Sequence, residues 1–148
     1  MFNYAGEPWK TQQAVRHIME TEYLNAPGGL SGNDDAGQMS AWYIFASLGF
    51  YPVCPGSPFY VLASPSFPKA ILHLENGKSF TLQAENASEE NIYIQKVTLN
   101  GKAYTKNYIS HKDIIAGGEM VFTMGNTPNK TWGNTPEDCP PSLIEVAE

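Results

Sequence analysis

The spacing of apolar residues changes near residue 56 of this 148-residue chain. Before that point apolar residues recur with the period of a helix, and after it they alternate with the period of a strand. The first part predicts one helix over residues 8–24, with Pro8 at its first position. A second helix is predicted to follow Asp35 and to end before Gly49, because Pro52 and Pro55 forbid its continuation.

The second predicted helix is apolar on nearly every side. Its apolar residues are Met39, Trp42, Tyr43, Ile44, Phe45, Ala46 and Leu48. A helix of this kind needs several neighbours to cover it, and the chain supplies only one. The pattern therefore indicates that the helical part belongs to a larger helical assembly.

The alternating part predicts an antiparallel β unit over residues 57–133. Two Asn-Gly pairs, Asn76-Gly77 and Asn100-Gly101, lie between alternating runs and predict hairpin turns. The run "GEMVFTMG" predicts a last strand, and the proline-rich residues 134–148 predict an extended tail. The fold class expected is thus α+β: a helical segment over residues 1–56, followed by an antiparallel, β-sandwich-like unit.

Composition excludes several classes of partner. The formal net charge is −6 and no basic stripe is present, which disfavours nucleic acid and anionic membranes. No apolar run has the length of a membrane span. Cys54 and Cys139 fit no metal-binding spacing, and whether they pair stays open. Met1 is followed at once by "FNYAGEPWKTQ", which reads as the middle of a domain and suggests that the natural polypeptide extends upstream.

The stretch "GGLSGNDDAGQMSAWY", residues 28–43, has two interpretations. Asp35 lies three residues before Gln38, which is the spacing of a capping box worth roughly 1 kcal/mol. A single aspartate suffices for a cap, however, and Asn33 and Asp34 add a second carboxylate and an amide. Carboxylates beside aromatic residues suit sugar hydrolysis, and their oxygens also suit calcium, although the EF-hand pattern is absent.

The longer segment "GLSGNDDAGQMSAWYIFASLGFYPVCPG" resembles the signature region of glycoside hydrolase family 92. The segments "NYAGEPWKTQ" and "GGEMVFTMGNTPNKTWG" resemble the flanking parts of that family, so the similarity covers roughly residues 3–133. The family's members are calcium-dependent, exo-acting α-mannosidases that invert the anomeric configuration. The resemblance implies that the two helices come from an (α/α) toroid and that the chain is its C-terminal portion.

The resemblance also implies roles for individual residues. Asp35 matches the family's catalytic base, and Asp34 is a second catalytic candidate beside it. Asn33 stands where some members carry aspartate, so this sequence offers an amide where a mechanism with two carboxylates at that spacing requires an acid. The residues expected to line the sugar pocket are Asn33, Trp9, Asn3 and Tyr4.

The family's general acid is a glutamate upstream of the signature, which places it before Met1, as it does most calcium-contacting residues. The chain alone is therefore expected to be inactive, with α-1,2-mannosides as the substrate of the full-length parent. Its expected partners are a mannose-containing glycan and the upstream region of the same polypeptide, in a periplasmic or extracellular location. The alternative is a non-catalytic carbohydrate-binding or structural β module, whose strand aromatics are Tyr60, Phe80, Tyr93 and Phe122.

Overall fold

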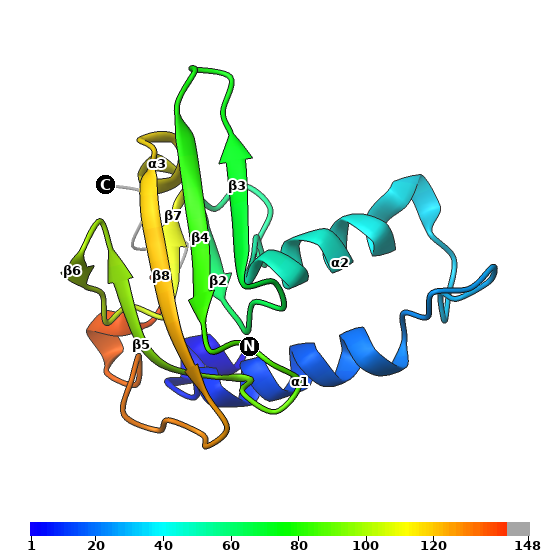
Figure 1. Ribbon diagram of the computed structural model, residues 1–148, viewed down its shortest axis with the longest axis horizontal. Helices are drawn as coiled ribbons and strands as arrows, with labels where there is room; N and C mark the ends of the chain where they lie inside the picture. The colour runs from blue at the N-terminus through cyan, green and yellow to red at the C-terminus, as the bar shows by residue number, and fades with distance from the viewer. Residues whose placement is uncertain (142–148) are drawn as a thin grey trace.

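The computed structural model describes residues 1–141 and confirms both predicted helices. Helix α1 spans Pro8–Thr21, with Pro8 in its first turn, and ends three residues before the predicted Leu24. Helix α2 spans Gln38–Leu48 and is followed by Gly49 at φ 88°, a left-handed conformation that suits glycine. Both helices extend away from the β strands toward one end of the molecule, where residues 22–37 connect them (Figure 1).

The strands form two sheets. Strands β1 (Phe50–Tyr51), β2 (Phe59–Leu62) and β7 (Tyr108–Ser110) form a small sheet in the order β1-β2-β7. The larger sheet has the order β3-β4-β8-β5-β6. Its strands are β3 (Lys69–His73), β4 (Ser79–Glu85), β5 (Tyr93–Leu99), β6 (Lys102–Ala103) and β8 (Gly118–Gly125).

One strand pair departs from the predicted antiparallel arrangement. Strands β4 and β8 run parallel, with Phe80 opposite Gly118 and Glu85 opposite Thr123. Between β6 and β8 the chain passes through β7 and the short helix α3 (His111–Ile115), and this connection lets β8 enter between β4 and β5 in the direction of β4. The other strand pairs are antiparallel, and the hairpins at Asn76-Gly77 and Asn100-Gly101 are present as predicted.

The apolar core lies between the two sheets, as in a β-sandwich. On β8, Met120, Phe122 and Met124 point into it with exposed fractions of at most 3%, as their alternation predicted. Leu62 of β2 and Ile109 of β7 close it from the opposite side. The expected α+β class, helices followed by a sandwich-like unit, is confirmed.

The helical segment is joined to the strands by buried polar contacts. The Gln12 Oε1 atom of α1 accepts a hydrogen bond from the backbone N–H of Ile94 in β5 at 2.9 Å. The Asn3 Nδ2 atom donates to the carbonyl oxygens of Leu62 and Asn107 at 2.9 and 2.8 Å. Strand β1, which falls within the predicted helical segment 1–56, also pairs with β2. These contacts tie residues 1–56 and the β unit together.

Residues 134–141 of the predicted tail lie against the β unit. They contain a 3-10 turn over Pro136–Asp138, and the Asp138 carbonyl oxygen accepts a hydrogen bond from the backbone N–H of Asn107 at 2.8 Å. The rest of that predicted segment, residues 142–148, lies outside the described residues.

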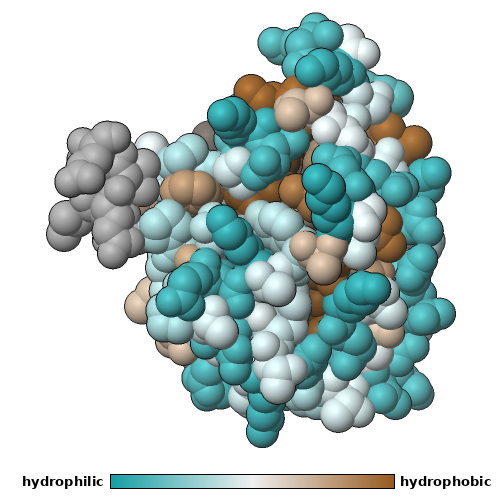
Figure 2. Space-filling view, turned by 90° about the vertical axis from the view of Figure 1, so that its left-hand side faces the viewer, coloured by the Kyte–Doolittle hydropathy of each residue, from teal (hydrophilic) through white to brown (hydrophobic). Residues whose placement is uncertain are grey.

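Both ends of the molecule expose apolar side chains. The end away from the helices is largely hydrophilic, with apolar patches interrupted by polar residues (Figure 2). At the helical end four large apolar side chains are exposed: Ile18, Leu24, Tyr43 and Ile44. Among residues 1–141, no helix has both the length and the apolar character that crossing a membrane requires.

Candidate active site

A tight turn precedes helix α2 and carries Asp35. It is a 3-10 turn over Asp35–Gly37, closed by a hydrogen bond from the Gly37 N–H to the Asp34 carbonyl oxygen at 2.9 Å. Ala36 has φ 54° and ψ 24°, and Gly37 has φ 76°, so two successive residues are left-handed. This conformation costs alanine about 1 kcal/mol and separates Asp35 from the regular part of α2.

Asp34, rather than the predicted Asp35, caps helix α2. The Asp34 Oδ1 atom accepts hydrogen bonds from the backbone N–H groups of Met39 and Ser40 at 2.8 and 3.1 Å. Its Oδ2 atom accepts a hydrogen bond from the Ser40 hydroxyl at 2.6 Å. These bonds, with the Ser40 hydroxyl first, hold the pKa of the Asp34 carboxyl below its ordinary value.

The capping prediction for Asp35 is thereby wrong. The helix begins at Gln38 rather than directly after Asp35, so the left-handed turn places Asp34 under the free N–H groups. The carboxylate of Asp35 is exposed and accepts no hydrogen bond from any residue within 1–141. The structure thus leaves one of the two aspartates free to interact with water or a ligand.

An aromatic cluster lies beside the first turns of α2. The rings of Tyr23 and Trp42 stack with centroids 5.5 Å apart, and Tyr43 lies 5.0 Å from Tyr23. The Tyr23 hydroxyl donates to the Met39 carbonyl oxygen at 3.2 Å. Burial, and then the charge of Asp34, raise the pKa of Tyr23 above its ordinary value. A groove of about 540 Å³ beside the cluster is lined by Tyr23, Leu24, Asn25, Leu30, Ser40, Tyr43 and Ile44.

Among the predicted sugar-binding residues, Asn33 lies in the loop that carries Asp35, whereas Asn3 and Tyr4 lie elsewhere. Asn33 adjoins Asp34 and is exposed, whereas Asn3 is fully buried and its amide donates to two backbone carbonyls. Tyr4 lies in a separate depression beside Asn134, Pro136 and Cys139. In Figure 1 the start of α1 lies beneath the strands, whereas the turn before α2 lies at the far end of the long axis.

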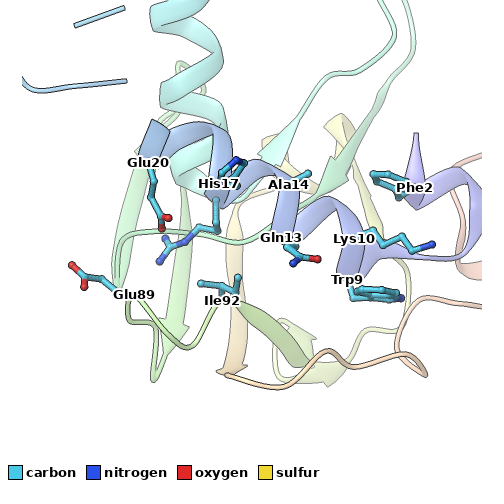
Figure 3. A pocket seen from close by; sticks show the side chains of 10 residues that line it. Phe2, Trp9, Lys10, Gln13, Ala14, His17, Glu20, Glu89 and Ile92 are labelled. Atoms are coloured by element: carbon cyan, nitrogen blue, oxygen red, sulfur yellow. The ribbon is translucent and has the colours of Figure 1, made fainter. Parts of the chain in front are cut away.

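Trp9 lies in a groove of about 710 Å³ along α1. The ammonium groups of Lys10 and Lys130 lie 5.3 and 5.2 Å from the centroid of its ring. Figure 3 shows Trp9 and Lys10 at one end of this groove and Glu20 and Glu89 at the other. The groove contains neither Asp34 nor Asp35, so the role of Trp9 in a pocket formed with Asp35 stays a prediction.

The described residues do not form a calcium cage. No group of three or more His, Cys, Asp or Glu residues within 1–141 is placed to hold a metal ion. Calcium takes six to eight oxygen ligands, whereas residues 28–37 offer only the two carboxylates of Asp34 and Asp35. The residues present therefore do not fit a calcium ion by themselves. Cys54 and Cys139 are both free thiols.

The family model described as the glycosyl hydrolase family 92 catalytic domain matches residues 1–126. The chain belongs to glycosyl hydrolase family 92. This assignment places Asp35 in a chain related to glycosidases.

Solved structures of family 92 agree with the fold. An α-mannosidase of Bacteroides thetaiotaomicron superposes with a TM-score of 0.92 at 43% identity, over 96% of this chain and 19% of that one. A second protein of that organism, described as an inverting mannosidase, gives a TM-score of 0.90 at 44% identity, over 95% and 19% of the two chains. A protein of Arthroderma benhamiae described as an uncharacterized secreted glycosidase is 36% identical, over 97% of this chain and 19% of its own length. This family 92 chain thus spans about a fifth of the length of these relatives.

Sequence reasoning missed Tyr23 and Ser40 as neighbours of the site. Tyr23, in the segment after α1, donates to Met39 in the first turn of α2, and Ser40, in that same turn, donates to Asp34. Ser40 lies six residues after Asp34, a spacing that matches neither an ordinary cap nor a capping box. The left-handed conformation of Ala36 creates this spacing, and nothing in the sequence indicates it.

Proposed function

We propose that the chain is the C-terminal portion of an inverting, exo-acting α-mannosidase and that Asp35 is its general base. The carrying observation is the exposed carboxylate of Asp35, which stands on a turn held by Asp34 and has no partner among the described residues. The family membership and the mannosidases among the structural neighbours support this reaction class.

The proposed reaction is a single displacement at the anomeric carbon. The Asp35 carboxylate removes a proton from a water molecule, and the water oxygen forms a bond to the anomeric carbon. The bond from that carbon to the leaving oxygen breaks on the opposite face of the sugar. A glutamic acid from the upstream part of the polypeptide gives its proton to the leaving oxygen.

Several finer features belong to the same proposal. The substrate is a terminal α-1,2-linked mannose of a glycan such as an N-glycan. A calcium ion acts in the parent polypeptide, with ligands mostly outside this chain. The parent is periplasmic or extracellular, in keeping with the A. benhamiae relative that is described as secreted. Because the acid lies outside the chain, the chain alone hydrolyses mannosides no faster than buffer does.

The upstream region of the same polypeptide is the proposed partner of the helical end. Leu24 is 63% exposed and Ile44 is 60% exposed on adjoining segments of that end. Large apolar side chains grouped in this way mark an interaction surface.

The strand aromatics argue against the alternative of a carbohydrate-binding β module. Phe80 and Phe122 have no exposed surface, and Tyr93 is 9% exposed. Tyr60 is half-buried, and its ring packs against the rings of Phe45 and Phe50. Aromatic residues bind sugars through an accessible ring face, which Phe80, Phe122 and Tyr93 lack. The hydrolase is therefore the better-supported function.

The replacement Asp35→Asn in the full-length parent tests the proposal. We expect kcat on an aryl α-mannoside to fall by about a thousandfold or more, with KM within about threefold, because only proton removal is lost. Asp113→Asn makes the same change in the first turn of α3 and is expected to keep kcat within about twofold. Full activity of Asp35→Asn would show that another group is the base.

A further inference from the structure

Few contacts restrain the turn that carries Asp35. Residues 31–33 and 35–36 are exposed, and Asp35 makes no side-chain hydrogen bond to another described residue. Asp34 holds the start of the turn in two ways. Its carbonyl oxygen accepts a hydrogen bond from the Gly37 N–H, and its side chain accepts hydrogen bonds from the start of α2. The direction in which Asp35 points therefore depends on where Asp34 is fixed.

Ser40 makes two of the three hydrogen bonds that the Asp34 carboxylate accepts. The Ser40 hydroxyl donates to Oδ2 at 2.6 Å and its backbone N–H donates to Oδ1 at 3.1 Å. Without the hydroxyl, Oδ2 has no partner among the described residues, and the carboxylate can rotate about its two remaining bonds to Oδ1. The hydroxyl of Ser40 is thus the contact that orients the plane of the carboxylate.

The helix turn that carries Ser40 is itself fixed to Tyr23, in the segment that follows α1. The Tyr23 hydroxyl donates to the Met39 carbonyl oxygen, and the Tyr23 ring stacks on Trp42 one helical turn further on. A support for a reacting group needs such a rigid base, because a misplacement of about 1 Å can cost a hundredfold in rate.

We propose that Ser40 is a positioning residue for Asp35, which it orients through Asp34. Asp34 in this arrangement takes no part in proton transfer, since both of its oxygens accept hydrogen bonds from the start of α2. The inference about Asp35 as base rests on the function proposed above, whereas the link from Ser40 to the turn is a property of this chain alone.

The kinetic test compares three variants in the full-length parent. We expect Ser40→Ala to lower kcat about tenfold with KM within about twofold, and Ser40→Thr, which keeps the hydroxyl, to restore most of kcat. Ser110→Ala is the matched control. It removes a serine that donates to the Asp113 carboxylate and accepts from the Asp113 N–H at the start of α3. Equal losses of kcat in Ser40→Ala and Ser110→Ala, or no loss in Ser40→Ala, would overturn the proposal.

A second measurement uses the 148-residue chain and needs no activity. We expect Ser40→Ala to speed hydrogen exchange at the amides of Met39 and Gly37 by about tenfold, and Ser110→Ala to leave them unchanged. Carbon-13 NMR of the side-chain carboxyl should show the pKa of Asp34 rising toward its ordinary value in Ser40→Ala. Unchanged exchange and titration would overturn the link between Ser40 and the turn. A parent that fails to hydrolyse any α-mannoside would instead overturn the proposed function, and the exchange result would still decide the role of Ser40.

Discussion

Asp34 and Asp35 are neighbours in the chain, yet their carboxylates have opposite surroundings. Three donors from the start of α2 bind the carboxylate of Asp34, whereas the carboxylate of Asp35 is exposed and has no partner in the described part of the chain. A carboxylate that accepts several hydrogen bonds is a poor acceptor for a proton, because those bonds stabilise its charged form. Asp34 therefore stabilises the turn, and Asp35 is the carboxylate that we propose as the base.

The hydrogen bonds of Asp34 predict a dependence of stability on pH. Its pKa in the folded state lies below the ordinary value of 3.8, so its contribution is fully present above that value. The contribution is lost as the pH falls through the lowered folded pKa. We expect the difference in unfolding free energy between the wild type and Asp34→Asn to narrow from about pH 6 to about pH 3, as measured by urea denaturation.

Ser40→Ala provides a second check on this dependence. It removes the bond that lowers the pKa of Asp34 most, so its difference from the wild type should narrow over the same pH range. A difference that stays constant or widens on acidification, in both variants, would contradict the assignment of the effect to Asp34.

At the scale of elements, the sequence predicted the features that depend on residues close together in the chain, such as hairpin turns. At Asn100-Gly101 both residues have positive φ, 51° and 76°, which gives the two-residue turn that suits the twist of the adjoining strands. At Asn76-Gly77 only Gly77 is left-handed, at φ 78°, and its N–H closes the turn by donating to the Leu74 carbonyl oxygen. The partners of β8 could not be predicted, since its place between β4 and β5 depends on the path of the chain through β7 and α3. Alternation gives the face that a strand buries, and it carries no information about which strand lies beside it.

The candidate site was predicted less completely than the fold. The motif located Asp34 and Asp35 at the start of α2, but the sequence assigned the cap to the wrong aspartate. Capping rules assume that the helix begins directly after the cap, whereas Ala36 is left-handed and delays the helix to Gln38. Alanine seldom adopts this left-handed conformation, so no pattern in the sequence predicts it at Ala36.

The end of helix α2 gives a prediction with a matched pair of glycines. Gly49 at φ 88° and Gly56 at φ 82° share a conformation, but a Cβ atom at Gly49 would lie 2.9 Å from the Pro65 Cβ, whereas one at Gly56 meets no atom within 4 Å. We expect Gly56→Ala to cost about 1 kcal/mol and Gly49→Ala about 2–4 kcal/mol in unfolding free energy, measured in urea. Equal costs for the two variants would mean that Pro65 moves aside freely.

At the scale of the whole molecule, the β unit encloses its apolar core, whereas the helical end leaves apolar side chains exposed. The core between the two sheets is closed, with Phe80, Phe122 and Leu62 fully buried. Helix α2 buries only Ala46 and Ser47, although its sequence is apolar on nearly every side. The sequence expectation that this helix needs further neighbours therefore agrees with its large exposed side chains. The chain also spans only 19% of the B. thetaiotaomicron α-mannosidase and of the A. benhamiae glycosidase.

A charged residue at the helical end should destabilise the parent polypeptide much more than it destabilises this chain. In the chain, Ile44 is 60% exposed and Ile115 of α3 is 41% exposed, so Ile44→Glu and Ile115→Glu should each cost less than about 0.5 kcal/mol in unfolding free energy. In the parent, where we propose that the upstream region covers α2, Ile44→Glu would bury an unpaired charge. We therefore expect Ile44→Glu to lower the Tm of the parent by about 3 °C or more, and Ile115→Glu to lower it by less than about 1 °C. Equal shifts in the parent would show that Ile44 stays in solvent there, and the exposed apolar side chains of α2 would then need another partner.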